Sequence, residues 1–237
     1  WHMGRTVLPD YIDGNQPVAP SAIAAEGMIH GKDGNLKPFV VPRALTKKEI
    51  AAIVLDFVTA ARNAVDAGLD GVEIHAANNF LIDSFLRDGT NSRTDEYGGS
   101  AENRARFLIE IVDGISAAIG AGRVGVRLSP TNGVYGISDS DPQTTFVTVA
   151  KLLNQTGIAY LHVLEPPKDV EHPMTSDLQN VAPAIRRAYN GTLILNGGFD
   201  AERANIAINQ DDGEAVSFGV PFIANPNLVE RWKAGLA

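Results

Sequence analysis

Residues 123–129 read Arg123-Val124-Gly125-Val126-Arg127-Leu128-Ser129, a short and mostly apolar run that ends on a polar residue. An amphipathic stretch over 142–156 follows it, and the next apolar run covers 159–163. A short strand, a helix and another short strand in this order make a parallel βαβ unit. The same alternation continues on both sides, so the sequence predicts an α/β protein built on a parallel sheet.

Five strand–helix units follow residue 45. A helix is expected first, because Thr46 and Glu49 form a capping box ahead of apolar residues at helical spacing, and Gly68 supplies its stop. The predicted strands are 71–75, 123–129, 159–163, 192–196 and 214–218, and the predicted helices are 102–119, 142–156, 177–189, 200–209 and one from about 225 onward.

The strands mostly end in polar residues or glycine, which favours a TIM (β/α)8 barrel with its site at the carboxyl ends of the strands. A doubly wound open sheet is the alternative. That fold normally carries a G-x-G-x-x-G motif after its first strand, and the sequence has none.

A closed barrel needs eight units, so we expect residues 1–237 to form a single partial barrel domain. At least two units are therefore missing, and residues 1–5 are a candidate for the tail of one more strand. Two unpaired sheet edges would then be covered by a complementary chain segment or by a second copy of the chain. A start on Trp and His rather than Met indicates a piece of a longer chain.

Glycine and proline recur every few residues over 6–45, so this stretch is expected to be irregular. A flexible excursion and a functional loop remain open alternatives for it.

Composition narrows the function classes. With 44% hydrophobic and 20% charged residues, the chain resembles ordinary globular proteins. A net charge of −8 disfavours nucleic acid and anionic membranes as partners. No apolar run reaches the roughly 18 residues of a membrane span, and the first residues lack a signal-peptide core. The absence of cysteine excludes a thiol nucleophile and fits a reducing, cytoplasmic compartment.

Several chemistries lack their motifs. The five histidines form no H-x-H or H-E-x-x-H pair, so no metal site is expected. No lysine falls in a predicted strand, which disfavours Schiff-base chemistry, and no G-x-S-x-G elbow occurs.

The densest polar cluster follows the first predicted strand. His75 ends that strand and Asn78 comes three residues later, so one turn brings two neutral donors to the same place. Such a pair can hold a carbonyl oxygen as it gains negative charge. The alternative is a buried histidine beside an asparagine in a turn. The charged residues beyond them predict one ion-pair network that orders the loop: Arg93, Asp95, Glu96, Glu102 and Arg104.

Arg127 lies inside an apolar strand, where a guanidinium is costly unless it is paired or bound to a ligand. Both explanations stay open. Gly197 and Gly198 follow the fourth strand and Gly219 the fifth, at the place where β/α barrels often bind phosphate. Two ordinary turns are the alternative for these glycines.

Residues 74–107 resemble the signature of the Old Yellow Enzyme family, FMN-dependent ene-reductases on a TIM barrel. The resemblance rests on Ile74–Ile82, Phe85–Asp88, Asn91–Ser100 and Glu102–Phe107, with Trp1–Arg5 similar to the family's third strand, Gly125–Pro130 to its fifth, and Phe218–Gly219 with Phe222–Pro226 to its eighth-strand loop.

The resemblance implies that FMN, reduced by NADH or NADPH, passes a hydride to an activated alkene such as an enone or nitroalkene. His75 and Asn78 would hold the substrate oxygen, and Trp1 would line the substrate pocket. Arg127 would lie near flavin N1 and O2. The three glycines, Gly197, Gly198 and Gly219, would approach the FMN phosphate.

Two positions depart from the family pattern. Phe80 stands where the family has a tyrosine proton donor, and Val220 stands where it has a phosphate-binding arginine. By comparison with the family's TIM (β/α)8 barrel, the resemblance also implies that the chain lacks the first two β/α units and most of strand three, which include a glutamine just ahead of Trp1. We therefore expect impaired alkene reduction, and two alternatives stay open: a flavin-dependent isomerase, and a catalytically silent relative that does not retain FMN.

Overall fold

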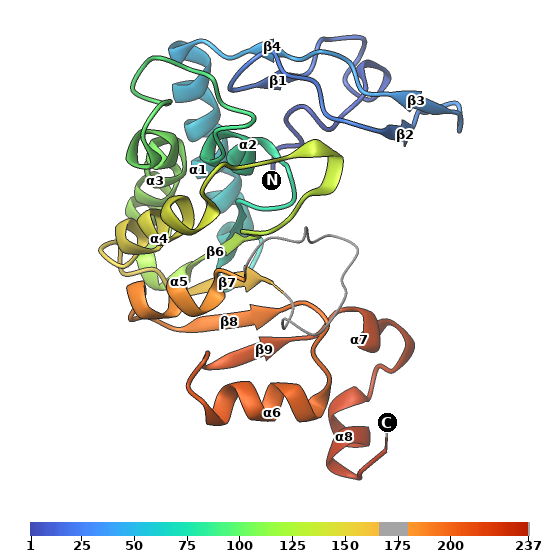
Figure 1. The fold of residues 1–237 in the computed structure, drawn as a ribbon, viewed down its shortest axis with the longest axis vertical. Helices are drawn as coiled ribbons and strands as arrows, with labels where there is room; N and C mark the ends of the chain where they lie inside the picture. Colours follow the sequence, from blue (N-terminus) through green and yellow to red (C-terminus); the bar gives the residue numbers. More distant parts are fainter. Residues whose placement is uncertain (166–179, 237) are drawn as a thin grey trace.

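The computed structural model describes residues 1–165 and 180–236. A sheet of five parallel strands forms its centre, in the order β5-β6-β7-β8-β9 (Figure 1). The strands are β5 (Val72–His75), β6 (Val124–Leu128), β7 (Tyr160–Leu164), β8 (Leu193–Asn196) and β9 (Ala215–Ser217). All five predicted strands are therefore confirmed, each shifted by a residue or two. Sequential neighbours in space and parallel pairing are what consecutive βαβ units produce.

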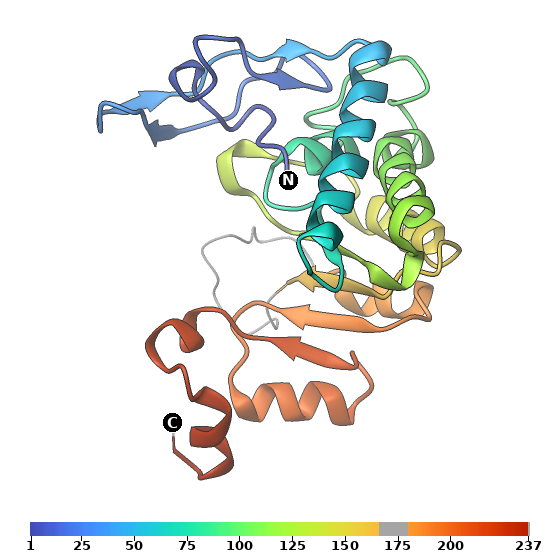
Figure 2. The same cartoon turned by 180° about the vertical axis from the view of Figure 1, so that it is seen from behind.

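Four helices cover one face of the sheet. They are α1 (Lys47–Asp66), α3 (Ala101–Ile119), α4 (Pro142–Leu153) and α5 (Ala182–Ala188). Each contacts the next in this order, and Figure 2 shows α1 lying along α3. Next to β9 lies α6 (Ala201–Asn209), and the chain continues through α7 (Val220–Ala224) and α8 (Leu228–Lys233) (Figure 1).

The core lies between the sheet and these helices. Residues at every second strand position point into it, among them Ile74, Val126, Leu161 and Leu195, and all are buried. Their partners across the interface are the apolar faces of α3 and α4, such as Leu108 and Val149. This alternation leaves the other face of the sheet to a different set of side chains, described below.

The capping box is confirmed at the start of α1. Glu49 N–H donates to Thr46 Oγ1 over 3.3 Å, and Thr46 N–H donates back to the Glu49 carboxylate over 2.8 Å. Arg43 adds an ion pair to the same carboxylate over 2.8 Å. These contacts satisfy amides that the first helical turn leaves without partners.

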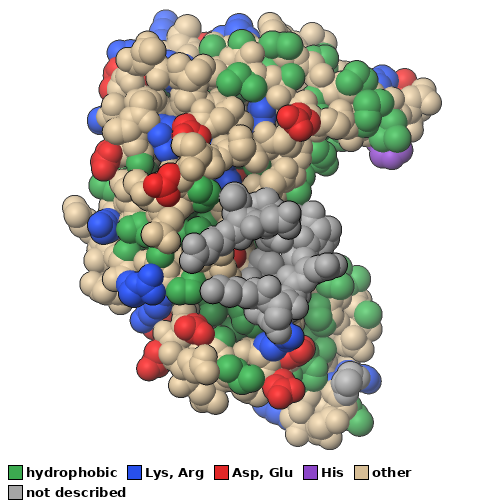
Figure 3. Space-filling view, in the orientation of Figure 1, with side chains coloured by type: hydrophobic (Ala, Val, Ile, Leu, Met, Phe, Trp, Pro, Cys, Tyr) green, Lys and Arg blue, Asp and Glu red, His purple; other side chains and the backbone are tan. Residues whose placement is uncertain are grey.

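The expectation of an irregular stretch over 6–45 is wrong in part. A parallel pair joins β1 (Val18–Ala19) to β4 (Arg43–Ala44), and β2 (Met28–His30) with β3 (Leu36–Pro38) forms an antiparallel hairpin. This hairpin projects from the molecule, and Figure 3 shows hydrophobic side chains gathered on it. Strands of two or three residues carry too little alternation to be seen in a sequence.

The expectation of a strand tail over Trp1–Arg5 is also wrong. Gly4 adopts the left-handed region at φ +60°, and Thr6 N–H donates to Met3 O, so the chain turns here. The turn lies against α2 (Leu81–Leu86), where Leu81 N–H donates to His2 O. A β-carbon on Gly4 would lie 2.9 Å from the α-carbon of Leu81, so the close approach needs glycine.

The remaining differences are small. The predicted helix over 177–189 begins at Ala182, and residues 177–179 of it lie outside the described residues. The short helix α2 escaped prediction, because all six of its residues are buried and show no helical periodicity of polar and apolar positions. Among the helices of the described residues, none is long and apolar enough to cross a membrane.

Candidate functional site

The face of the sheet opposite the core is polar. Seven side chains at alternate strand positions line it: Glu73, His75, Arg127, Tyr160, His162, Asn196 and Ser217. The register places His75 beside Arg127, and Arg127 beside His162, on neighbouring strands. Inward-pointing residues of a β/α barrel are usually apolar, so core packing alone does not explain the polar side chains on this face.

His75 lies at the end of β5 within an aromatic cluster. Its ring centre is 6.0 Å from that of Trp1 and 5.0 Å from that of Phe80. Burial, together with the positive charge of Arg127, lowers the pKa of His75 to about 4. The imidazole is therefore neutral near pH 7 and can donate an N–H bond without carrying charge.

Asn78 is held in the loop after β5. It has φ +58°, in the left-handed region that asparagine tolerates best among non-glycine residues, and its N–H donates to Ser129 Oγ over 2.9 Å. Asn132 Nδ2 donates to Asn78 Oδ1 over 3.3 Å. With that oxygen engaged, the Nδ2 group of Asn78 is the polar end left for a ligand.

Within the described residues, Arg127 makes one hydrogen bond, from Nη2 to Asn196 Oδ1 over 2.8 Å. In residues 1–165 and 180–236 no carboxylate lies within 4.0 Å of its guanidinium, so the buried salt bridge is not found. Its Nε is buried and has no hydrogen-bond partner in the part of the chain that the structure describes. Burial lowers the pKa of Arg127, and the charge of Glu73 acts against that shift. A buried donor without an acceptor is the feature that a bound ligand would satisfy.

The predicted phosphate loops lie at the carboxyl ends of β8 and β9. Gly197 and Gly198 have φ of +113° and +68°, values that side chains with a β-carbon rarely adopt. Gly219 has open space where a β-carbon would point. Val220 is 80% exposed, so a larger side chain at this position would meet no packing obstacle.

Trp1 and Phe80 are stacked, with ring centres 6.0 Å apart and an interplanar angle of 13°. Trp1 is otherwise exposed. The rings of Trp1, Phe80 and His75 thus lie side by side, and we call these three residues the aromatic wall. It offers flat apolar surface and the N–H of His75, and Phe80 contributes no exchangeable proton.

The predicted single ion-pair network is three separate pairs. Arg93 pairs with Asp95 over 2.6 Å and also donates to the carbonyls of Pro20 and Leu45. The other two pairs join Lys47 to Glu96 over 2.5 Å and Arg104 to Asp139 over 3.5 Å. Glu102 belongs to none of them within the described residues. These contacts still connect the loop before α3 to Pro20, Leu45 and Lys47. Arg104, at the start of α3, makes the connection to the loop after β6 through Asp139.

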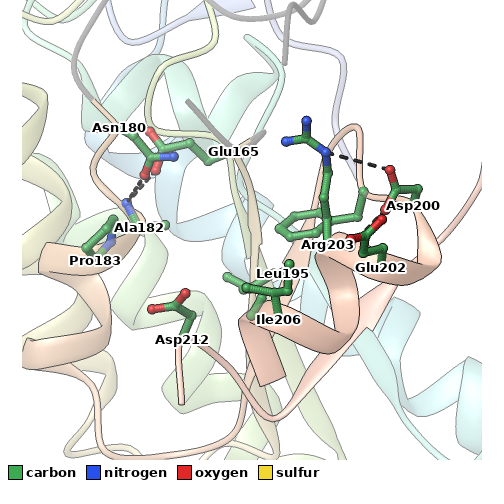
Figure 4. A pocket seen from close by; sticks show the side chains of 12 residues that line it. Glu165, Asn180, Ala182, Pro183, Leu195, Asp200, Glu202, Arg203, Ile206 and Asp212 are labelled. Carbon is green, nitrogen blue, oxygen red and sulfur yellow. Dashed lines mark hydrogen bonds and ion pairs between the residues drawn. The ribbon is translucent and has the colours of Figure 1, made fainter. Parts of the chain in front are cut away.

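A cavity of about 550 Å³ opens between α5 and α6, and its lining includes none of the residues of the polar face or the aromatic wall (Figure 4). Glu165 lies at one side of it, where burial raises its pKa to about 7 against the hydrogen bonds donated by Val181 and Ala182 N–H groups. Leu195 and Ile206 line its apolar part. No predicted site residue lines this cavity. In the described part of the chain, no group of three or more His, Asp or Glu side chains could hold a metal ion.

The model of the NADH:flavin oxidoreductase / NADH oxidase family matches residues 1–237. The chain belongs to this family. It is 42% identical to the probable flavin mononucleotide-dependent alkene reductase of Leishmania infantum, over 98% of this chain and 63% of that protein. It is 38% identical to flavin oxidoreductase hxnT of Emericella nidulans, over 100% of this chain and 65% of that protein.

Solved structures of the family are similar to this chain along its whole length. The Old Yellow Enzyme homologue from Zymomonas mobilis superposes with a TM-score of 0.95 at 43% identity, over 100% of this chain and 66% of that chain. Morphinone reductase gives 0.91 at 43% identity, over 100% and 64%. The resemblance to Old Yellow Enzymes is confirmed, and so is the TIM-barrel fold class, of which this chain forms five β/α units. The chain spans about two thirds of the length of these relatives.

Five residues on the polar face were not singled out from the sequence: Glu73, Tyr160, His162, Asn196 and Ser217. The sequence did contain a signal for them. Each lies two residues from another residue of its strand, so the two side chains point to the same face of the sheet. Asn132 was missed as well, and nothing in the local sequence shows that it reaches Asn78 across 54 residues.

Proposed function

We propose that the protein is an FMN-dependent reductase of activated alkenes that takes its reducing equivalents from NADH or NADPH. The observation that carries the proposal is the buried Nε of Arg127, which has no hydrogen-bond partner among the described residues and lies beside the neutral His75. Family membership supports it, as do a relative named as an alkene reductase and the structure of morphinone reductase in complex with tetrahydroNAD. The lack of cysteine supports a reducing, cytoplasmic location.

The residues present fit a bound FMN in most respects. Arg127 has a buried donor that a flavin carbonyl or ring nitrogen would satisfy, and its charge would stabilise an anionic ring. Gly197, Gly198 and Gly219 would let the backbone approach the phosphate closely. When bound, FMN supplies the hydride that adds to the substrate double bond.

The substrate oxygen would be held by His75 and Asn78. The neutral imidazole donates one N–H bond, and the amide donates a second from Nδ2, because Asn132 occupies its oxygen. Two aimed donors polarise a conjugated carbonyl or nitro group and stabilise the charge that develops on its oxygen. The aromatic wall would pack against the flat alkene. The substrate class that fits is a small enone or nitroalkene.

Two residues weaken this site. Phe80 cannot supply the proton that the α-carbon needs, and general acid catalysis typically contributes about 10²–10⁴-fold. Val220 replaces a cation near the proposed phosphate, which we expect to cost roughly 1.5–3 kcal/mol of FMN binding. Strongly activated alkenes therefore suit the site best. Phe80 also favours a second function, isomerisation of unsaturated carbonyl compounds, because that reaction returns the hydride and needs no net proton.

The proposal is tested by titrating the purified chain with FMN and following flavin absorbance and fluorescence. Uptake of one FMN, loss of absorbance on anaerobic addition of NADH or NADPH, and its return on adding 2-cyclohexenone are the expected results. A chain that takes up no FMN, or whose reduced flavin does not respond to enones or nitroalkenes, contradicts it.

A further inference from the structure

Asn78 and Asn79 are two consecutive left-handed residues in the loop after β5. Their φ angles are +58° and +64°, values that non-glycine residues hold only where surrounding contacts fix them. The Asn78 N–H donates to Ser129 Oγ over 2.9 Å, and the Asn79 N–H donates to Asp83 Oδ2 over 2.9 Å. Two side chains, Ser129 and Asp83, therefore hold the backbone of the proposed oxygen-binding asparagine.

Asp83 forms a buried ion pair with Arg87, the residue that follows α2. Arg87 Nε donates to Asp83 Oδ1 over 2.8 Å, and the exposed fractions of the two side chains are 1% for Arg87 and 0% for Asp83. Arg87 Nη1 donates to Pro130 O over 2.9 Å, and Nη2 donates to Ser129 O. All three nitrogens of the guanidinium are thus used. The pair joins the loop after β5, through Asp83, to the loop after β6, through the two carbonyls.

The same contacts extend to Asn132. Its N–H donates to Ser129 O over 3.1 Å, so this carbonyl accepts from both Arg87 and Asn132. The Asn132 side chain in turn donates to Asn78 Oδ1 over 3.3 Å. Asn78 is therefore fixed at two places. Ser129 Oγ holds its backbone, and an amide from the turn that Arg87 holds engages its side chain.

We propose that Ser129 and the Asp83–Arg87 ion pair together position Asn78, so that its Nδ2 meets the substrate oxygen in a fixed direction. This inference rests on the proposed function, in which Asn78 and His75 hold that oxygen. A buried ion pair contributes little net stability, because the cost of removing two charges from water offsets their attraction. Its directed donors do fix geometry, which an apolar pair of the same size would not. Both side chains are buried, so they act through Asn78 as positioning residues.

This role has a kinetic consequence. Donors at a reacting oxygen stabilise the transition state fully only when they are placed within about 0.5 Å of the productive geometry. The charge on the substrate oxygen grows as the double bond is reduced, so a displaced Asn78 weakens binding of the transition state more than binding of the substrate. Loosening the contacts that hold Asn78 should therefore lower kcat more than it raises KM.

The first test is Arg87→Lys in the FMN-loaded chain, assayed with 2-cyclohexenone. Lysine keeps the positive charge beside Asp83, but its single nitrogen cannot reach the carboxylate and both carbonyls. We expect kcat to fall by about 10–10²-fold, with a smaller change in KM. Arg93→Lys is the matched control, because Arg93 also pairs with an aspartate and donates to two carbonyls, those of Pro20 and Leu45. Its kcat should equal that of the wild type.

Ser129→Ala is a second variant, which keeps the ion pair and removes the acceptor of the Asn78 N–H. We expect a loss in kcat of the same size. Ser116→Ala is its control, since the Ser116 hydroxyl has no hydrogen-bond partner among the described residues. The double variant Arg87→Lys/Ser129→Ala should lose little more than the weaker of the two single variants, because both changes release the same residue. Circular dichroism checks that each variant folds, and Ser129→Ala decides if Arg87→Lys does not.

Binding of p-nitrophenol gives a readout that does not depend on turnover. Its phenolate oxygen carries a charge like the one that develops on the substrate oxygen, so two N–H donors favour the anion and lower the pKa of the bound phenol. Absorbance titration follows this pKa with and without FMN. Arg87→Lys and Ser129→Ala should each raise it by about 1, a tenfold weaker preference for the anion, and Arg93→Lys should leave it unchanged.

Folded Arg87→Lys and Ser129→Ala variants that keep the wild-type kcat and the wild-type pKa of bound p-nitrophenol overturn the inference. An equal loss in Arg93→Lys also overturns it, because that result indicates general loosening of the fold. So does a wild type that leaves the pKa of p-nitrophenol unchanged. If the wild type takes up no FMN or does not reduce the enone, the proposed function fails instead, and the titration without FMN still decides whether these residues position Asn78.

Discussion

Asn132 donates from its Nδ2 to the Oδ1 of Asn78 over 3.3 Å. Asn132 is itself fixed by the Val134 N–H, which donates to its Oδ1 over 2.9 Å, and only 2% of its surface is exposed. One amide thus sets the orientation of the other. The consequence is that Asn78 presents a donor, not an acceptor, to a substrate oxygen.

Replacing Asn132 tests this orientation. In Asn132→Asp the carboxylate cannot donate, so Asn78 is expected to turn its own Nδ2 toward Asp and its oxygen toward the substrate. We expect kcat/KM for 2-cyclohexenone to fall roughly tenfold or more, a loss of about 1.4 kcal/mol in transition-state binding. Asn35→Asp, in the hairpin turn, is the control. Equal kcat/KM for the two variants would show that Asn132 does not position Asn78.

Restoring a hydroxyl at Phe80 should restore a proton donor. The Phe80 ring lies 5.0 Å from His75 in the aromatic wall, so a phenol there is close to the proposed substrate. Phe80→Tyr is expected to raise the turnover of enones by about 10²–10⁴-fold. Phe57→Tyr, on α1, is the matched control and should leave turnover unchanged. If Phe80→Tyr gives no gain, the proton reaches the substrate by another route.

A cation at position 220 should strengthen FMN binding. Val220 is 80% exposed, so the substitution Val220→Arg costs no core packing. An added charge-assisted contact to phosphate is expected to tighten Kd for FMN by roughly 10–150-fold, measured by fluorescence titration. Val229→Arg on α8 serves as the control for net charge. The same gain in both variants would point to long-range attraction in place of a phosphate contact.

The neutral state of His75 makes stability depend on pH. The pKa of His75 in the folded chain, about 4, lies below the ordinary 6.5. Between these two pH values the imidazole is protonated in the unfolded chain and neutral in the folded chain. Its contribution to stability is present above about pH 6.5 and is lost as the pH falls toward 4. Between these values the wild type should lose about 2 kcal/mol more of its free energy of unfolding than His75→Gln, with allowance for partial exposure. Identical losses in urea unfolding would contradict a depressed pKa.

Much of the fold follows from local sequence. Strand–helix alternation predicts all five strands, and the Thr46–Glu49 capping box predicts the start of α1. The projecting hairpin and α2 could not be predicted, because strands of three residues and a fully buried helix lack a periodic pattern. The turn at Gly4 depends on close packing against Leu81, a contact across 77 positions that no local pattern encodes.

The same distinction between local patterns and long-range contacts applies to the candidate site. His75, Asn78, Phe80 and Arg127 could be proposed from the sequence because each lies in or next to a recognisable strand or motif. The partners that define their chemistry come from elsewhere in the chain: Asn132 for Asn78 and Asn196 for Arg127. The hydrogen bonds of His162 to Glu73 and Ser217 join three strands, so only the register of the sheet reveals them.

The central claim is that His75 and Asn78 hold the substrate oxygen. It is tested most directly by stopped-flow reoxidation of the FMN-loaded, NADH-reduced protein with 2-cyclohexenone, for the wild type and for the double variant His75→Ala/Asn78→Ala. The account predicts that reoxidation by the enone falls by about 10²–10³-fold in the variant, while reoxidation by dioxygen, which needs no held carbonyl, keeps its rate. Equal reoxidation by the enone in both proteins would contradict it.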